Sequence, residues 1–299
     1  MTELEDLYMR MLKALEIEGL DIPIAAIRFF RRDDWIPEIL MGERPGNLTL
    51  TCCQAVRQAE LGDSVLLMER NMGCVAAAIS LGLVDRYQDE PLSGARVYTE
   101  IMREQSGAGS DFIPPTPKDF TDGLVYACTS VGRLDFCLFG KKDSGRFRDV
   151  STARRAVAEM AAIQPPIMKG IYFYHPRSGT LDLTPDIVLL SLRPVELTRL
   201  LQGLQFLTGK RISGSMGGLR SVCSDLIARA YLEEEACISS YCLGSRLIAR
   251  VDANRMGMGM PYAVFKEVVK GLEASRTGYP FSLYSGSVPC ANNSCTDPI

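Results

Sequence analysis

The chain has 299 residues, of which 46% are hydrophobic and 23% are charged. This composition is typical of globular proteins and far from that of disordered ones, and a chain this long can fold without structural disulfides or metal ions. Lysine plus arginine number 33 against 36 aspartate plus glutamate, a formal net charge of -3, so no overall basic field favours nucleic acid as a partner.

Residues 1–20 predict an amphipathic helix. Its acidic residues lie near the start, and Leu7, Met11, Leu12 and Leu15 recur at helical spacing. The segment lacks the basic start and unbroken apolar stretch of a signal peptide. The sequence also has no run of about 18 apolar residues that could span a bilayer. We therefore expect a cytoplasmic protein that has no membrane partner.

The next segments predict a strand, a helix and then a helix that begins at a cysteine. Residues 22–42 open with a short apolar strand that ends in arginine and passes into a helix. Residues 53–74, CQAVRQAELGDSVLLMERNMGC, give about nine helical residues, a polar turn, a β-like run and a second cysteine. Beyond them, residues 104–122 are rich in Gly, Pro and Asp and predict a long loop. A loop of this length is often a lid or a binding loop.

The middle of the chain predicts one helix and several strands. Residues 145–163 read as a helix capped by Ser151, and residues 169–176 as a strand that ends at His175. This histidine is the only one in the chain and precedes a proline, which is typical of a turn residue. Cys128 and Cys137 lie within apolar, strand-like runs, where a thiol usually serves as a small packing group.

The pattern of the first unit then returns. Residues 185–205 pass from an apolar strand through an arginine into a helix, with Pro194 near the helix start. Residues 223–242, CSDLIARAYLEEEACISSYC, again run from a cysteine through a helix, a polar turn and a β-like run to a second cysteine. The correspondence predicts an internal pseudo-repeat of approximately 22–85 and 185–252.

Alternating strands and helices predict an α/β or α+β fold. No linker divides the chain, so we expect residues 1–299 to form a single compact domain with two pseudo-equivalent strand-helix-loop-helix-strand halves. Residues 256–261, MGMGMP, read as an apolar edge near the second half, and a helix follows them. Residues 286–299 form an irregular tail that carries Cys290 and Cys295.

Ten cysteines are more than packing requires, and in a reducing compartment they point to metal or redox chemistry. The two matching pairs, Cys53 with Cys74 and Cys223 with Cys242, predict a site where the halves meet. Thiolates suit zinc or an iron–sulfur cluster. One histidine excludes Cys2His2 zinc and multi-histidine iron, and the chain has no C-x-x-C pair typical of zinc knuckles. Four merely structural cysteines remain the alternative.

A glycine-rich segment precedes Cys223. Gly214, Gly217 and Gly218 bring the backbone close to the helix that begins near this cysteine. Backbone N–H groups there could bind an anion or donate hydrogen bonds to cluster sulfurs. The segment lacks the Lys-Ser/Thr of a phosphate-binding loop, and an ordinary flexible turn is the alternative interpretation.

The sequence resembles the uncharacterised proteins of domain-of-unknown-function family 169, also called ArCR-like. The resemblance is carried by these segments: PIAAIRFF, CQAVRQAELGDSV, GCVAAAISLGL, GRFRDVSTARRAVAEM, PDIVLLSLRPVELTRLLQ, GSMGGLRSVCSD, YCLGSRLIARVD and MGMGMPYAVF. The family pattern has cysteine at the positions of Cys53, Cys74, Cys223 and Cys242, so the resemblance implies that these four belong together. It implies no particular activity.

Our leading hypothesis is a cytosolic redox protein whose Cys53, Cys74, Cys223 and Cys242 hold an iron–sulfur cluster, with a small-molecule substrate or a redox partner protein. One alternative is a metal-free thiol enzyme with Cys53 or Cys223 as nucleophile. Another is a small-molecule binding or regulatory module. The two similar halves also leave a homodimer open.

Overall fold

The structure is a computed structural model, which describes residues 1–15, 22–43, 49–84, 155–156, 159–178, 181–212, 214 and 216–275. Three features predicted from the sequence lie wholly outside the described residues: the long loop 104–122, the tail 286–299 with its two cysteines, and the strand-like runs around Cys128 and Cys137. Most of the predicted helix 145–163 also lies outside them.

The described residues form a six-stranded sheet in which every neighbouring pair is antiparallel. The strand order is β2-β3-β1-β4-β6-β5. The fold is therefore α+β, which confirms one of the two predicted classes. The strands are β1 (Ile24–Arg31), β2 (Ser64–Leu67), β3 (Met168–Tyr174), β4 (Ile187–Leu192), β5 (Cys237–Ser240) and β6 (Met256–Pro261).

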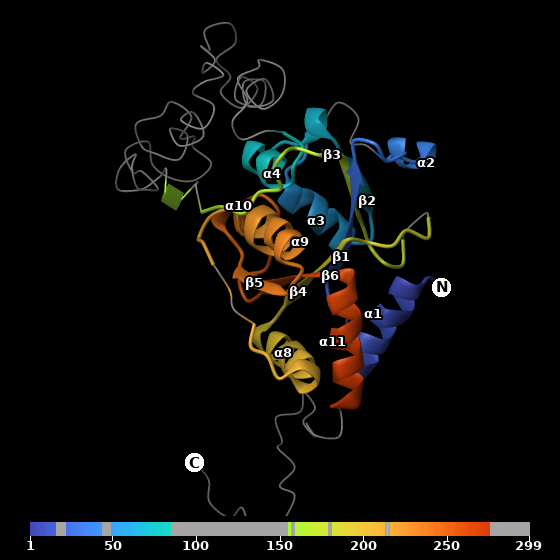
Figure 1. Cartoon of the computed structure of the whole chain (residues 1–299), viewed down its shortest axis with the longest axis vertical. Coiled ribbons are helices and arrows are strands. Elements are labelled where there is room, and N and C mark those ends of the chain that lie inside the picture. The colour runs from blue at the N-terminus through green and yellow to red at the C-terminus, as the bar shows by residue number, and fades with distance from the viewer. Residues whose placement is uncertain are drawn as a thin grey trace, which may run out of the picture.

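Helices cover both faces of this sheet (Figure 1). Residues of β4 alternate between the two cores: Ile187 and Leu189 face one, and Val188 and Leu190 face the other. The helical segments are α1 (Glu3–Ala14), α2 (Glu38–Met41), α3 (Cys52–Glu60), η1 (Glu69–Asn71), α4 (Val75–Ser80), α8 (Pro194–Thr208), η4 (Ser221–Ala228), α9 (Arg229–Glu233), α10 (Leu243–Leu247) and α11 (Tyr262–Ala274).

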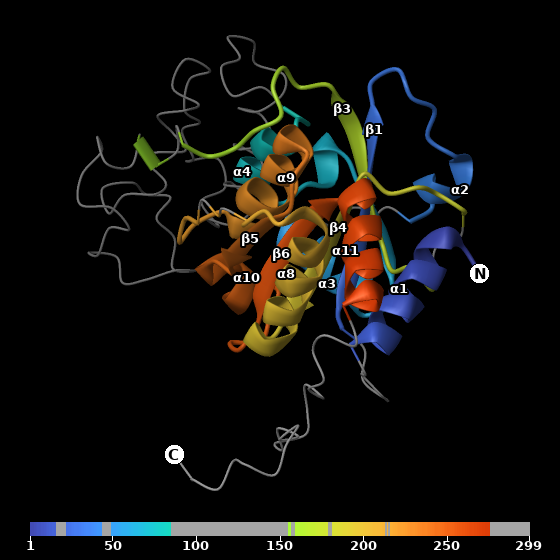
Figure 2. The same cartoon turned by 60° about the horizontal axis from the view of Figure 1, so that its bottom comes forward.

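One face is covered by α1, α8 and α11, which lie side by side in Figures 1 and 2. The predicted N-terminal helix is present as α1. Its first turn is capped by Thr2, whose Oγ1 accepts a hydrogen bond from the Glu5 N–H at 3.2 Å. Its apolar residues are buried against the sheet and α11. The other face carries α3, α4, η4, α9 and α10, and every cysteine of the predicted site lies there.

The sheet divides at its centre, where β1 pairs with β4. On one side the order outward is β1, β3, β2, and on the other it is β4, β6, β5. The first, second and third strand of each half thus occupy corresponding places. A duplication would produce this arrangement, and the duplication itself stays a prediction.

The glycine-methionine stretch 256–261 is not an apolar edge, as the sequence suggested, but the interior strand β6 between β4 and β5. Its glycines allow η4 to lie directly on the sheet. A Cβ atom on Gly259 would overlap the carbonyl oxygen of Leu226 in η4, and one on Gly257 would overlap the Leu226 side chain. The glycines therefore serve a close approach of two backbones.

Candidate functional site

Helix η4 places the first cysteine of the second pair. It is a π-helix of eight residues, all buried, and its N-cap Arg220 has a left-handed backbone with φ 62°. Both features are uncommon in proteins and are often found at functional sites. Cys223 lies in the first turn of this π-helix, and Ser221, at its start, accepts a hydrogen bond from the Cys242 N–H at 2.7 Å. The two cysteines of the second pair are therefore tied to one helix start.

Helix α3 places the first cysteine of the other pair. Thr51 and Gln54 form a capping box, in which Thr51 Oγ1 accepts from the Gln54 N–H at 3.2 Å and Gln54 Oε1 accepts from the Thr51 N–H at 2.9 Å. The cap starts the helix at Cys52, one residue before Cys53. Cys52 is buried in the core, whereas Cys53 is half-buried.

The remaining two cysteines are the N-cap residues of short helices, Cys74 of α4 and Cys242 of α10. Each follows the outermost strand of its half, β2 or β5. The sequence predicted two cysteines in helix starts and two after strands, and the structure places them in this way.

The contacts among the four cysteines cross between the two halves of the sheet. Cys53 Sγ lies 3.2 Å from Ser245 Oγ, and Cys242 Sγ lies 3.4 Å from the same oxygen. Ser245 Oγ therefore lies between the two sulfurs, and each thiol shifts the pKa of the other. The first cysteine of one pair thus shares a partner with the second cysteine of the other.

Arg220 links the other two cysteines. Its guanidinium Nη1 donates to Cys74 Sγ at 3.8 Å, and its carbonyl oxygen accepts from Cys223 Sγ at 3.7 Å. The electrostatic field of Cys74 also acts on Cys223. Since α4 and α3 both pack against η4, all four thiols gather where the helices of the two halves meet.

The thiol pair formed by Cys53 and Cys242 shares one proton. The hydrogen bond from Cys53 lowers the pKa of Cys242 to about 3, with further donation by Ser245 and Ser221. The same hydrogen bond, together with burial, raises the pKa of Cys53 well above its usual value. At neutral pH this pair therefore carries one thiolate and one thiol.

The pKa of Cys223 is raised, first by burial and then by Cys74, while Arg220 lowers it. Burial likewise raises the pKa of Cys52, which also lies in the field of Cys223, Cys74 and Cys242. Cys52 is therefore a close neighbour of the four thiols, although Cys53 makes the thiol contact. Two further side chains of the site, Ser245 and Arg220, were not predicted, because serine and arginine are common surface residues and no spacing marks them.

Cys237 and His175, the histidine that the sequence singled out, have other surroundings. Cys237 is buried in β5, and its thiol donates to the Glu235 carbonyl oxygen at 3.9 Å. Burial raises its pKa to about 11. His175 is buried in a turn, where its Nδ1 accepts from the Arg177 N–H at 3.1 Å and its ring meets Tyr8 edge-on.

The glycine segment before Cys223 is fastened to η4 by a side chain. The N–H of Gly217 donates to Asp225 Oδ2 at 3.3 Å, and the same carboxylate oxygen accepts from Ser239 Oγ at 2.9 Å. Gly214 packs against Ile238 of β5, whereas a Cβ on Gly218 would meet nothing. The Gly217 amide therefore has a partner within the protein, and anion binding by these three glycines stays a prediction.

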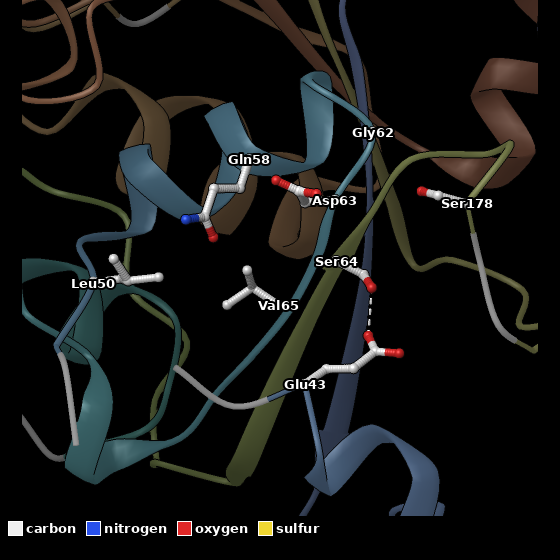
Figure 3. Close-up of a pocket in the computed structure, with 8 residues that line it drawn as sticks. All are labelled: Glu43, Leu50, Gln58, Gly62, Asp63, Ser64, Val65 and Ser178. Atoms are coloured by element: carbon white, nitrogen blue, oxygen red, sulfur yellow. Dashed lines mark hydrogen bonds between the residues drawn. The ribbon is translucent and has the colours of Figure 1, made fainter. Parts of the chain in front are cut away.

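A pocket of about 530 Å³ opens near the far end of α3. Its lining consists of Glu43, Leu50, Gln58, Gly62, Asp63, Ser64, Val65 and Ser178 (Figure 3). The Ser64 hydroxyl donates to Glu43 across it. None of its lining residues is a cysteine, so this pocket and the thiol cluster are separate features.

Across the described residues, no three His, Cys, Asp or Glu side chains stand close enough to hold one metal ion. The ligands of an iron–sulfur cluster bind different irons, so they are spaced more widely than the ligands of a single ion. In the same part of the chain, no helix is both long and apolar enough to cross a membrane.

Comparisons with known proteins give one match. Neither the curated proteins nor the solved structures match the chain significantly. The model of the family described as uncharacterised ArCR, DUF169, matches residues 15–271. This range includes all four cysteines of the site and every described strand. The chain therefore belongs to the uncharacterised ArCR family, DUF169.

Proposed function

We propose that this chain is a cytosolic redox protein that binds an iron–sulfur cluster through Cys53, Cys74, Cys223 and Cys242. One observation carries the proposal: four thiols from distant parts of the sequence converge crosswise, with Ser245 lying between Cys53 and Cys242 and Arg220 joining Cys74 to Cys223. Cysteine thiolates are the usual ligands of such clusters. When bound, the cluster would exchange electrons with a redox partner protein or a small-molecule substrate.

The surroundings of the four thiols fit a group with sulfur ligands. Ser245 Oγ and Arg220 Nη1 reach three of the sulfurs, and hydrogen bonds to ligand sulfurs tune the reduction potential of a cluster. Ser224, next to Cys223, is fully buried, and its Oγ has no hydrogen-bond partner among the described residues. A buried hydroxyl without a partner is costly, and a bound polar group could supply one.

Anaerobic reconstitution with iron and sulfide tests the proposal. The wild type is expected to turn brown and to retain iron and acid-labile sulfide after desalting. Changing Cys53, Cys74, Cys223 or Cys242 to Ser should lower the retained iron several-fold, because each change removes one thiolate ligand.

Cys237→Ser is the matched control, since Cys237 is a buried cysteine of the same layer whose thiol donates to the Glu235 carbonyl oxygen. It should load iron as the wild type does. A wild type that stays colourless and free of iron would overturn the proposal. Equal loss of iron in Cys237→Ser and Cys223→Ser would also contradict it.

A second candidate is a metal-free dithiol enzyme, favoured by the contact between Cys53 and Cys242. The lowered pKa makes Cys242 the nucleophile, rather than Cys53 or Cys223, whose pKa values are raised. The Cys242 thiolate would attack a disulfide of the substrate. Cys53 would then resolve the mixed disulfide, so that both substrate thiols are released and a Cys53–Cys242 disulfide forms.

Mass spectrometry after treatment of the metal-free protein with a disulfide oxidant separates the two functions. A Cys53–Cys242 disulfide that forms rapidly in a protein unable to load iron would favour the dithiol enzyme. Iron loading, with no disulfide formed in the loaded protein, would favour the cluster.

A further inference from the structure

A buried chain of polar groups runs from the C-terminal end of α3 to the thiol cluster. It begins at Glu60, the last residue of α3, whose side chain is 1% exposed. Ser191 of β4 donates through its hydroxyl to Glu60 Oε1, and the same hydroxyl is hydrogen-bonded to the Tyr241 hydroxyl. Tyr241 directly precedes Cys242 and lies in the electrostatic field of Cys53.

The two oxygens of Glu60 face different surroundings. Oε1 faces the buried hydroxyl of Ser191, whereas Oε2 lies 3.0 Å from Arg57 Nη1. The Arg57 side chain is 35% exposed, so the ion pair joins the buried carboxylate to a side chain that reaches solvent. The other oxygen of Glu60 belongs to the buried chain.

Besides the hydroxyl of Ser191, two arginines from different parts of the fold face Glu60. Arg57 of α3 is in direct contact, and Arg255, just before β6, acts on it electrostatically. Arg255 also donates to the Ser191 carbonyl oxygen at 2.6 Å and lies 3.6 Å from Glu196. Arg255 thus divides its charge between two buried carboxylates.

The chain suits proton exchange at Glu60 itself. Burial raises the pKa of Glu60, although Ser191 and Arg57 partly oppose the shift. Burial also raises the pKa of Tyr241, so the tyrosine stays neutral and serves only as a hydrogen-bonding hydroxyl. The carboxyl group is thus the member of the chain that can gain or lose a proton, and its pKa lies above its usual range.

We propose that Glu60 takes up one proton when the thiol site accepts one electron, and that Ser191 and Tyr241 couple the two events. The inference rests on the proposed redox function. The electron would come from an external one-electron donor and would be held by the iron–sulfur cluster that the four cysteines would bind, since thiols alone cannot store it. The proton comes from water and binds a Glu60 carboxylate oxygen. The proton balances the charge of the electron, so the net charge of the buried region does not change on reduction. On reoxidation both the electron and the proton leave.

Redox potentiometry of the reconstituted protein across pH tests this inference, with reduced viologen as donor. The reduction potential of the wild type should fall by about 59 mV for each pH unit of increase, because one proton is bound for each electron accepted. Glu60→Gln should remove this dependence. Glu60→Asp, which keeps a carboxyl group, should restore it, a rescue that a merely structural role would not give.

Glu196→Gln is the matched control, because Glu196 is also buried and shares Arg255. It should retain the wild-type pH dependence. Tyr241→Phe keeps Glu60 but cuts the hydrogen-bonded chain, and it should narrow the pH range over which the potential changes. An unchanged range in Tyr241→Phe would overturn the coupling role of the chain.

The possible failures can be told apart by measuring iron in every variant first. If the wild type holds no iron, the proposed function and this inference both fall. If the wild type and Glu60→Gln load iron equally and show the same pH dependence of the potential, only this inference is overturned.

Discussion

Cys53 and Cys242 illustrate how much one contact can change the chemistry of a thiol. The two residues are far apart in the sequence, and Ser245 bridges them. Cys242 becomes a thiolate because a neighbouring thiol and two serines direct hydrogen bonds at it, even though burial opposes its charge. Its helix α10 is short, so these hydrogen bonds are the main cause of the shift.

Cys53→Ala in the metal-free protein should raise the pKa of Cys242 from about 3 toward 9.0, because the hydrogen bond from Cys53 is its largest cause. An acid whose pKa is lower in the folded than in the unfolded protein stabilises the fold. The stabilisation is complete at pH values above the pKa of the unfolded state, and it is lost as the pH falls to the pKa of the folded state. The variant should therefore lose stability relative to the wild type at neutral pH and converge with it near pH 3.

Ultraviolet absorbance of the thiolate, followed against pH, gives the pKa, and urea unfolding at each pH gives the stability. Cys237→Ala is the control and should leave the titration of Cys242 unchanged. An identical thiolate titration in Cys53→Ala and the wild type would contradict the shared proton.

At this scale the sequence grouped four cysteines, whose role as one site stays a prediction, and it did not predict what surrounds them. The four were found because their spacing repeats. Arg220 could not be found, because its role depends on a left-handed backbone and on a side chain that reaches across to Cys74. Glu60 reads as a surface residue at the end of an amphipathic helix, and only the strand β4 beneath it makes it buried.

The sequence patterns of helix η4 and strand β6 predicted the two elements but not how they pack against each other. The sequence predicted a helix starting at Cys223 and an apolar segment at 256–261, and both elements exist. The close approach of their backbones joins distant parts of the chain, so no local pattern encodes it. The same device recurs on the other face, where a Cβ on Gly271 of α11 would overlap the Gly203 carbonyl oxygen of α8.

Gly259→Ala should destabilise the protein by about 3 kcal/mol or more, because its Cβ would overlap backbone atoms of η4 that cannot rotate away. Iron loading should fall as well, since the displaced helix carries Cys223. Urea unfolding and retained iron measure the two effects.

Gly218→Ala is the control for this change, because its Cβ would meet nothing within 4 Å. We expect it to alter stability by no more than about 0.5 kcal/mol. A Gly259→Ala variant as stable as Gly218→Ala would show that η4 can move away from β6 at little cost.

On the scale of the whole molecule, the alternation of strands and helices was enough to predict an α/β or α+β fold but not the strand order. Strand β3 was predicted from residues 169–176, yet nothing in that stretch says that it inserts between β1 and β2. The antiparallel pairing of β1 with β4 at the centre is likewise a long-range choice. This pairing brings the two sets of cysteine-bearing helices together.

Because the proposed ligands come from both halves of the sheet, a bound cluster should stabilise the whole molecule. Binding at 100-fold the dissociation constant adds about 2.7 kcal/mol. In a chain of this size that shift corresponds to about 4 °C in Tm. Anaerobic thermal denaturation before and after reconstitution measures it.

Cys223→Ser should show little of this rise in Tm, and Cys237→Ser should show all of it. An equal rise in the two variants would mean that iron stabilises the protein at some other place.

The glycines of β6 also affect which positions of the protein can be substituted without moving Cys223. Where a helix rests on a sheet through side chains, any substitution in that layer can raise, lower or tilt it. Here main-chain atoms of η4 meet main-chain atoms of β6, so the height of Cys223 above the sheet is set by van der Waals contact between backbones and not by the size of a side chain. Side chains elsewhere in the layer could be exchanged for others of similar volume, at some cost in stability, while this sulfur keeps its position.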